Sequence, residues 1–161
     1  DVVARRFSFV DVGHSFRATE FEAAVGLGQI ERKEAIIKAR QANAKVLMEG
    51  LADLQEHIQL PTVPVGRDHM FMMFPIVLKR EPKASLVNFL EDNKIETRDL
   101  LPLLSQPVYK KLFGDLEPNY PVARRLNQSG FYIGTHQYLT RKELDYMVDR
   151  IHRYFKMAKV G

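Results

Sequence analysis

The sequence predicts an α/β domain, more narrowly an α+β arrangement in two layers, in which helices flank a small mixed or antiparallel sheet. Three observations predict it. Apolar residues recur at helical spacing in several stretches, and capping signals precede two of them. Short apolar runs of strand length lie between those stretches. The chain has 161 residues, of which 45% are hydrophobic, so one core of this kind can be buried.

The first part of the chain is predicted to be helical after a short extended piece over residues 6–12. Thr19 and Glu22 have the spacing of a capping box, in which a hydroxyl and a carboxylate satisfy the free amides of a helix start. Small residues along this helix, at positions 23, 24, 26 and 28, predict close packing against a neighbour. A long amphipathic helix with a basic outer face is predicted over residues 31–54.

The middle of the chain begins with a strand. Residues 70–78 are almost continuously apolar, which predicts a buried strand, and Pro75 within it requires a bulge or an edge position. A helix over residues 84–93 and a short strand over residues 95–100 are predicted to follow. A loop with one helical turn is predicted over residues 102–115.

The last part contains two further helices and one strand. Pro121 and Gly130 have the positions of the first residue and the end of a helix. Residues 131–134 then predict a strand. Thr140 and Glu143 form a second capping box, which predicts the start of a final amphipathic helix.

Composition excludes several classes of protein. The 24 Lys and Arg and the 20 Asp and Glu are interspersed, and the formal net charge is +4, which argues against a disordered tail or a nucleic-acid-binding face. The absence of Cys excludes a disulfide scaffold, a thiol nucleophile and a thiolate metal site. The sequence has no apolar run of about 20 residues and no His pair at metal-ligand spacing, so neither a membrane span nor a metal site is predicted.

Two histidines stand in contexts that suit a ligand site. His14 and His136 both lie in short loop segments close to glycine, and polar side chains flank each of them. Either ligand binding or a hydrogen-bonded structural histidine fits this context. A further candidate is Arg98, on the predicted strand. The residues alone therefore indicate an α/β domain with two candidate ligand loops.

Four blocks of sequence occur in an order typical of one enzyme family. Residues 13–30 read GHSFRATEFEAAVGLGQI, residues 95–98 read IETR, residues 103–109 read LLSQPVY, and residues 120–140 contain YPVA and GFYIGTHQ. Together they resemble the DegT/DnrJ/StrS-type sugar aminotransferases, whose signature is GYNYRMTExQAAxGxxQL and whose later blocks include IETR and QPxY. These are pyridoxal-phosphate (PLP) enzymes of the aspartate-aminotransferase fold, fold type I. The resemblance spans nearly the whole chain.

The resemblance implies that the sequence is the C-terminal part of a longer enzyme, in keeping with Asp1 where an initiator Met would stand. Residues 1–161 are then the C-terminal domain, with residues 1–56 an interface or linking helical segment and residues 57–161 the α/β small domain. The N-terminal domain, which in this family holds the Schiff-base Lys, is absent from the sequence. We therefore expect no catalytic residue in this chain and no transamination by the chain alone.

The resemblance also implies which residues contact the cofactor and the substrate. Ser15, where the family has Asn, and Arg17 are the expected cofactor-binding residues, because the signature loop of the family reaches a neighbouring subunit's cofactor phosphate. His14 replaces the family's Tyr and is an expected substrate-binding residue. The other residues expected to face the substrate are Arg98, Gln106, His136 and Gln137. No metal is expected.

For the whole enzyme, the resemblance implies transfer of an amino group from an amino acid, typically glutamate, to a nucleotide-linked keto-sugar. This reaction belongs to polysaccharide, cell-surface or antibiotic sugar biosynthesis, and a cytoplasmic homodimer is expected, without nucleic acid or membrane as partner. Exposed apolar surface is expected on the predicted strand over residues 70–78 and on the small-residue helix. One alternative is a keto-deoxysugar dehydratase of the same family, which has His in place of the Lys. The other is a non-catalytic interaction domain that uses the basic helix over residues 31–54.

Overall fold

A computed structural model describes residues 8–13, 17–100 and 103–158 of the chain. Its α-helices are α2 (Glu20–Ile30), α3 (Lys33–Gly50), α4 (Lys83–Asp92), α5 (Pro107–Phe113), α6 (Pro121–Ser129) and α7 (Arg141–Ala158). Short 3-10 turns η1, η2 and η3 occupy Ala52–Leu54, Leu103–Ser105 and Glu117–Asn119. The strands are β1 (Ile58–Gln59), β2 (Met73–Leu78), β3 (Thr97–Asp99) and β4 (Gly130–Gly134).

The four strands form one sheet in the order β1-β2-β4-β3, and every neighbouring pair is antiparallel. The sheet is therefore antiparallel, one of the two forms that the sequence predicts. Pro75 is tolerated in a central strand because β1 pairs only with Val77 and Leu78, so on the β1 side Pro75 has no strand partner. On the other side Pro75 lies opposite Tyr132, which in turn lies opposite Arg98.

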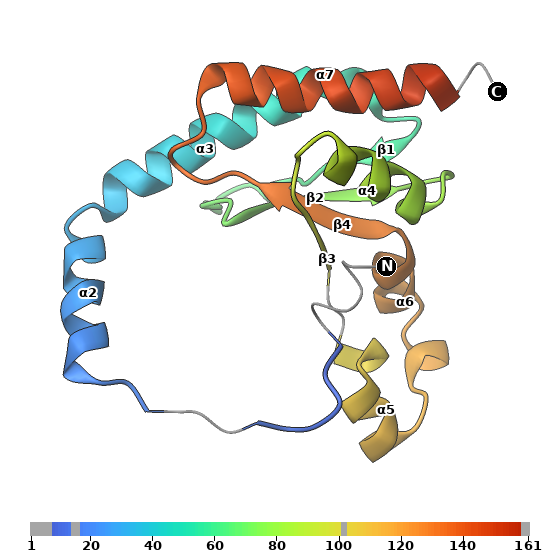
Figure 1. The fold of residues 1–161 in the computed structure, drawn as a ribbon, viewed down its shortest axis with the longest axis horizontal. Helices are drawn as coiled ribbons and strands as arrows, with labels where there is room; N and C mark the ends of the chain where they lie inside the picture. Colours follow the sequence, from blue (N-terminus) through green and yellow to red (C-terminus); the bar gives the residue numbers. More distant parts are fainter. Residues whose placement is uncertain (1–7, 14–16, 101–102, 159–161) are drawn as a thin grey trace.

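Helices α3, α4 and α7 cover one face of the sheet, and α3 and α7 run side by side along it (Figure 1). The alternation of β2 and β4 turns Phe74, Ile76, Phe131 and Ile133 to this face, and all four are fully buried. The helices complete the core with Leu47, Leu51, Leu86, Leu90, Leu144, Ile151 and Phe155. The two-layer α+β arrangement is thus confirmed, and the C-terminal half of α3 belongs to the same core as α7.

Both predicted capping boxes are present. The backbone N–H of Thr19 donates to the Glu22 carboxylate at 2.6 Å, and the Glu22 N–H donates to the Thr19 hydroxyl at 3.5 Å, at the start of α2. Thr140 and Glu143 form the same reciprocal pair before α7, at 2.7 and 3.3 Å. Pro121 is the first residue of α6 and Gly130 follows its end, as predicted.

Some elements differ from the sequence prediction. The loop over residues 102–115 was expected to hold a single helical turn, but α5 spans seven residues there and begins at Pro107, a residue suited to the first position of a helix. Strand β1 was not predicted, since its two residues are too short to show an alternating pattern. The predicted helix over residues 31–54 begins at Lys33, ends at Gly50 and continues as η1.

Helix α2 stands apart from the sheet and its covering helices (Figure 1). None of its residues is buried, and Phe21, Leu27 and Ile30 are 78%, 63% and 65% exposed. Met70 and Met72, just before β2, are exposed as well. The expected exposed apolar surface is therefore present on this helix and before this strand.

Candidate functional site

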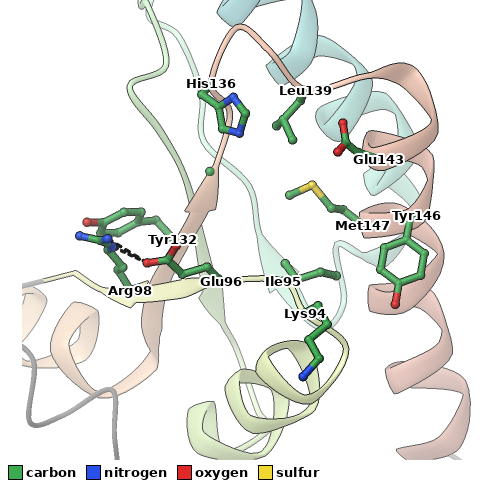
Figure 2. Close-up of a pocket in the computed structure, with 11 residues that line it drawn as sticks. Lys94, Ile95, Glu96, Arg98, Tyr132, His136, Leu139, Glu143, Tyr146 and Met147 are labelled. Carbon is green, nitrogen blue, oxygen red and sulfur yellow. Dashed lines mark hydrogen bonds and ion pairs between the residues drawn. The ribbon is translucent and has the colours of Figure 1, made fainter.

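The candidate site is a pocket of about 410 Å³ at the open edge of the sheet, between β3, β4 and the first half of α7. Figure 2 shows its side chains around a hollow, with Arg98, Glu96 and Tyr132 on the sheet side and Glu143, Tyr146 and Met147 on the α7 side. His136 lies above, in the turn after β4, and Lys94 and Ile95 lie below, after α4. Gly134 and Leu139 complete the lining.

Arg98 is held in the pocket wall by the carboxylate of Glu96, which lies two residues earlier, just before the edge strand β3. Its Nε and Nη2 donate to the Glu96 carboxylate at 3.0 and 2.8 Å. These hydrogen bonds and the charge of Glu96 raise the pKa of the Arg98 guanidinium above its usual value, and Tyr132 adds a smaller contribution. Arg98 therefore presents a permanent cation, already oriented, beside the Tyr132 phenol.

His136 is fixed by its backbone and by its ring. Its carbonyl accepts a hydrogen bond from the Asn43 side-chain amide at 2.8 Å, which ties the turn after β4 to α3. Its Nδ1 accepts the backbone N–H of Tyr138 at 3.3 Å, so the neutral ring carries its proton on Nε2. His136 also stands near Glu143, whose pKa is lowered mainly by the hydrogen bonds from Thr140.

The turn that carries His136 is also anchored to a strained residue before β2. Thr135 is fully buried, and its hydroxyl donates to the Phe71 carbonyl at 2.6 Å. Arg40, on α3, donates to the same carbonyl at 3.4 Å and to the Met72 carbonyl at 3.0 Å. Phe71 has φ 50°, a left-handed conformation that costs energy for any residue with a Cβ. These contacts hold it there, and they fix the rim from which His136 enters the pocket.

The floor of the pocket is formed where α4 ends. Lys94 has φ 63° and occupies the position after the helix cap, with its N–H bonded to the Glu91 carbonyl at 3.0 Å. The Tyr146 hydroxyl donates to the Asn93 carbonyl at 3.1 Å and so ties α7 to this helix end. The lining thus combines three basic side chains, two acidic ones and two phenols, a set that suits a hydroxyl-rich ligand carrying charge.

The predicted site residues do not all meet in this pocket. Arg98 and His136 lie in it, whereas Gln137 is absent from its lining and its Oε1 is buried without a hydrogen-bond partner in the described part of the chain. Gln106 is buried elsewhere, beside the segment over residues 8–13. Arg17 is exposed on the extended segment before α2. His14 and Ser15 lie outside the described residues.

Sequence reasoning missed most of the acidic and aromatic side chains of this pocket. A signal for Tyr132 exists, because a strand that buries Phe131 and Ile133 must turn the residue between them to the other face. Glu143 was assigned only to the capping box. Tyr146 carries no local signal, because its partner at the end of α4, Asn93, is 53 residues away in the sequence.

Other groups of charged side chains lie outside this pocket. On the far side of α7, the His152 Nε2 faces the Asp53 carboxylate at 2.9 Å, and its Nδ1 faces the Val148 carbonyl at 2.9 Å. The described residues contain no group of three or more His, Asp or Glu that could hold a metal ion. Among the helices described, none has the length and apolar character that a membrane crossing needs.

Comparisons with known proteins converge on one family. The sequence model of the DegT/DnrJ/EryC1/StrS aminotransferase family matches residues 2–152. The chain is 31% identical to the lipopolysaccharide biosynthesis protein RfbH of Salmonella typhimurium over 93% of its own length and 36% of that protein. It is 28% identical to the dTDP-4-dehydro-2,6-dideoxy-D-glucose 3-dehydratase of Saccharopolyspora spinosa over 92% of its own length and 33% of that enzyme.

The fold is also found in solved structures. The PLP form of the putative sugar aminotransferase Spr1654 from Streptococcus pneumoniae superposes with a TM-score of 0.78, at 18% identity, over 88% of this chain and 36% of that one. The chain spans about one third of the length of these relatives.

Proposed function

The chain belongs to the DegT/DnrJ/EryC1/StrS aminotransferase family, and we propose that it forms the C-terminal part of a PLP-dependent sugar aminotransferase. The match over residues 2–152, together with the fold, carries this proposal. The complete enzyme transfers an amino group from an amino acid, with glutamate the expected donor, to a nucleotide-linked keto-sugar. It acts as a homodimer in the cytoplasm. The same proposal keeps residues 1–56 as an interface or linking helical segment and residues 57–161 as the α/β small domain.

PLP supplies the electron sink for removal of a proton at carbon, and the catalytic Lys belongs to the part of the enzyme outside this chain. Here, Ser15 and Arg17 are the proposed cofactor-binding residues. A guanidinium and a hydroxyl are suitable donors for a phosphate group, and Arg17 is exposed on the segment before α2. At the start of α2 the Thr19 and Glu22 N–H groups are already paired in the capping box, so the proposal places the phosphate on the Arg17 and Ser15 side chains.

The pocket at the sheet edge is the proposed surface for the nucleotide-linked sugar. Arg98 would contact an anionic or hydroxyl group of the substrate, since Glu96 holds its guanidinium in a fixed orientation. His136 would donate from Nε2, because its Nδ1 is occupied by the Tyr138 N–H. Gln137 and His14 remain proposed substrate-binding residues on the basis of the family resemblance.

A second candidate is a PLP- or pyridoxamine-phosphate-dependent dehydratase of nucleotide-linked keto-deoxysugars. The observation that favours it is the 28% identity to the 3-dehydratase of Saccharopolyspora spinosa. The two enzymes differ at the residue where the aminotransferase has its Lys and the dehydratase has His, and this residue is outside the chain.

The experiment incubates the full-length enzyme with PLP, glutamate and a set of nucleotide-linked keto-sugars, and identifies the products by mass spectrometry. We expect an amino-sugar product and stoichiometric 2-oxoglutarate. Loss of a sugar hydroxyl without net amination would favour the dehydratase, and failure to bind PLP would refute both candidates. As a test of the pocket, Arg98→Met should raise KM for the sugar nucleotide, whereas Arg124→Met, at an exposed position of α6, should not.

A further inference from the structure

Gln106 makes a contact that the expected substrate role does not explain. Gln106 is only 6% exposed, and its Oε1 accepts a hydrogen bond from the backbone N–H of Phe9 at 3.1 Å. The backbone N–H of Val108 donates to the Phe9 carbonyl at 3.0 Å. Two hydrogen bonds thus hold both backbone polar groups of Phe9 against the start of α5. Phe9 and Gln106 are 97 positions apart in the sequence.

These hydrogen bonds matter because side-chain burial contributes little to holding this part of the chain. The side chains of Phe9, Val10 and Val12 are 50%, 71% and 48% exposed. The segment over residues 8–13 runs beside α5 and forms with it a second pocket of about 290 Å³. Figure 1 shows this segment passing from the α5 region toward α2. A buried glutamine oxygen is costly unless it is paired, and here it is paired with the backbone of this segment.

The contact lies close in sequence to the proposed phosphate-binding residue. Arg17 follows Phe9 by eight positions and precedes Thr19, which caps α2. Arg17 therefore lies between the hydrogen-bonded contact at Phe9 and the capped start of α2. Restricting the segment at its Phe9 end lowers the conformational entropy that is lost when its side chain binds a ligand.

We propose that Gln106 is a positioning residue, which holds the segment of residues 8–13 on α5 and thereby places Arg17 to bind the PLP phosphate. The inference rests on the proposed function, since PLP is the ligand. Gln106 acts through the Phe9 backbone and does not touch the substrate. The QPV sequence at residues 106–108 then serves one purpose: the side chain of Gln106 and the N–H of Val108 bind Phe9, and Pro107 begins the helix that presents them.

The test uses the full-length enzyme and measures the PLP dissociation constant by absorbance and fluorescence. Gln106→Met keeps the shape of the side chain and removes the acceptor, and Gln106→Glu keeps an acceptor oxygen. Gln128→Met, on the exposed face of α6, is the matched control. Hydrogen–deuterium exchange of the peptides that contain Phe9 and Val108 reports directly on the two hydrogen bonds in the same samples.

Loss of one hydrogen bond predicts that Gln106→Met weakens PLP binding about fivefold and speeds exchange at Phe9. Gln106→Glu should bind PLP within about twofold of the unsubstituted enzyme, and Gln128→Met should change neither quantity. Unchanged PLP affinity in Gln106→Met, with faster exchange at Phe9, would overturn the inference and leave the proposed function intact. Equal weakening by both Gln106 variants would also overturn it, because the acceptor would not matter. Absence of PLP binding in the unsubstituted enzyme would overturn the proposed function and the inference together.

Discussion

Gly130 joins α6 to β4 at a point where a methyl group has no room. A Cβ built on Gly130 would lie 2.6 Å from the Leu126 carbonyl oxygen and 2.6 Å from Leu100 Cδ1, whereas real Cβ contacts do not fall below 3.0 Å. Its φ of −102° is accessible to alanine, so the conflict in Gly130→Ala is purely steric. Leu100 can change rotamer. The Leu126 carbonyl belongs to the helix backbone and accepts the Gly130 N–H, so it cannot move without loss of that bond.

The expected magnitude follows from this conflict. Overpacking of this kind costs about 1–3 kcal/mol, and the lower entropy of an unfolded chain with alanine offsets about 0.4–1 kcal/mol of it. Taking the middle of each range, Gly130→Ala should therefore lower the free energy of unfolding by about 1.3 kcal/mol. Urea unfolding, monitored by circular dichroism, measures this loss of stability. The urea midpoint should fall, and the dependence of the free energy of unfolding on urea concentration should stay the same.

Two variants control this measurement. Gly134 is on the same strand, and a Cβ there would meet nothing closer than His136 Cδ2 at 3.9 Å, so Gly134→Ala should change the free energy of unfolding by less than about 0.5 kcal/mol. The double variant Gly130→Ala/Leu100→Ala should not recover stability, because the backbone contact remains. Equal free energies of unfolding for Gly130→Ala and Gly134→Ala would refute the reasoning, and recovery in the double variant would assign the cost to Leu100.

Two further changes test local features. Lys94→Gly should raise the free energy of unfolding by about 0.5–1 kcal/mol, because Lys94 has φ 63° at a helix end where glycine is not strained; an unchanged or lower urea midpoint would contradict this. The hydrogen bond from His152 lowers the pKa of Asp53 from its ordinary 3.8, so Asp53 stabilises the fold above that pH, and the stabilisation is lost as the pH falls through the lowered pKa. Because Asp53 is exposed, Asp53→Asn should cost only about 0.5 kcal/mol at pH 5 and less than that at pH 2. The role would be excluded if the substitution lowered the urea midpoint by the same amount at both pH values.

Elements set by neighbouring residues could be predicted from the sequence. Thr19 with Glu22 and Thr140 with Glu143 begin their helices where the capping boxes place them, because each pair interacts across only three positions. Strand β1 could not be predicted in this way. It exists because Ile58 and Gln59 pair with Leu78 and Val77, some twenty positions later in the chain.

The same distinction applies to the candidate site. Arg98 and His136 were predicted as members of the site and do lie in one pocket, but this meeting depends on the pairing of β3 with β4, which the separate motifs do not specify. Tyr146 and Lys94 lie in the pocket lining because α7 contacts the end of α4. Residue type therefore indicated which side chains could bind a ligand, whereas the pairing of β3 with β4 determines which of them lie in the same pocket.

Two glutamines predicted for the same role show why residue type alone is insufficient. In the described part of the chain, the Oε1 of Gln137 is buried without a hydrogen-bond partner, so it retains an acceptor for another group. The Oε1 of Gln106 is committed to the Phe9 N–H. A ligand would have to reach a buried oxygen at Gln137, but a ligand at the Oε1 of Gln106 would have to displace the backbone of its own chain. The difference comes from partners distant in the sequence: the Gln106 oxygen holds the segment over residues 8–13, whereas Gln137 stays a proposed substrate-binding residue.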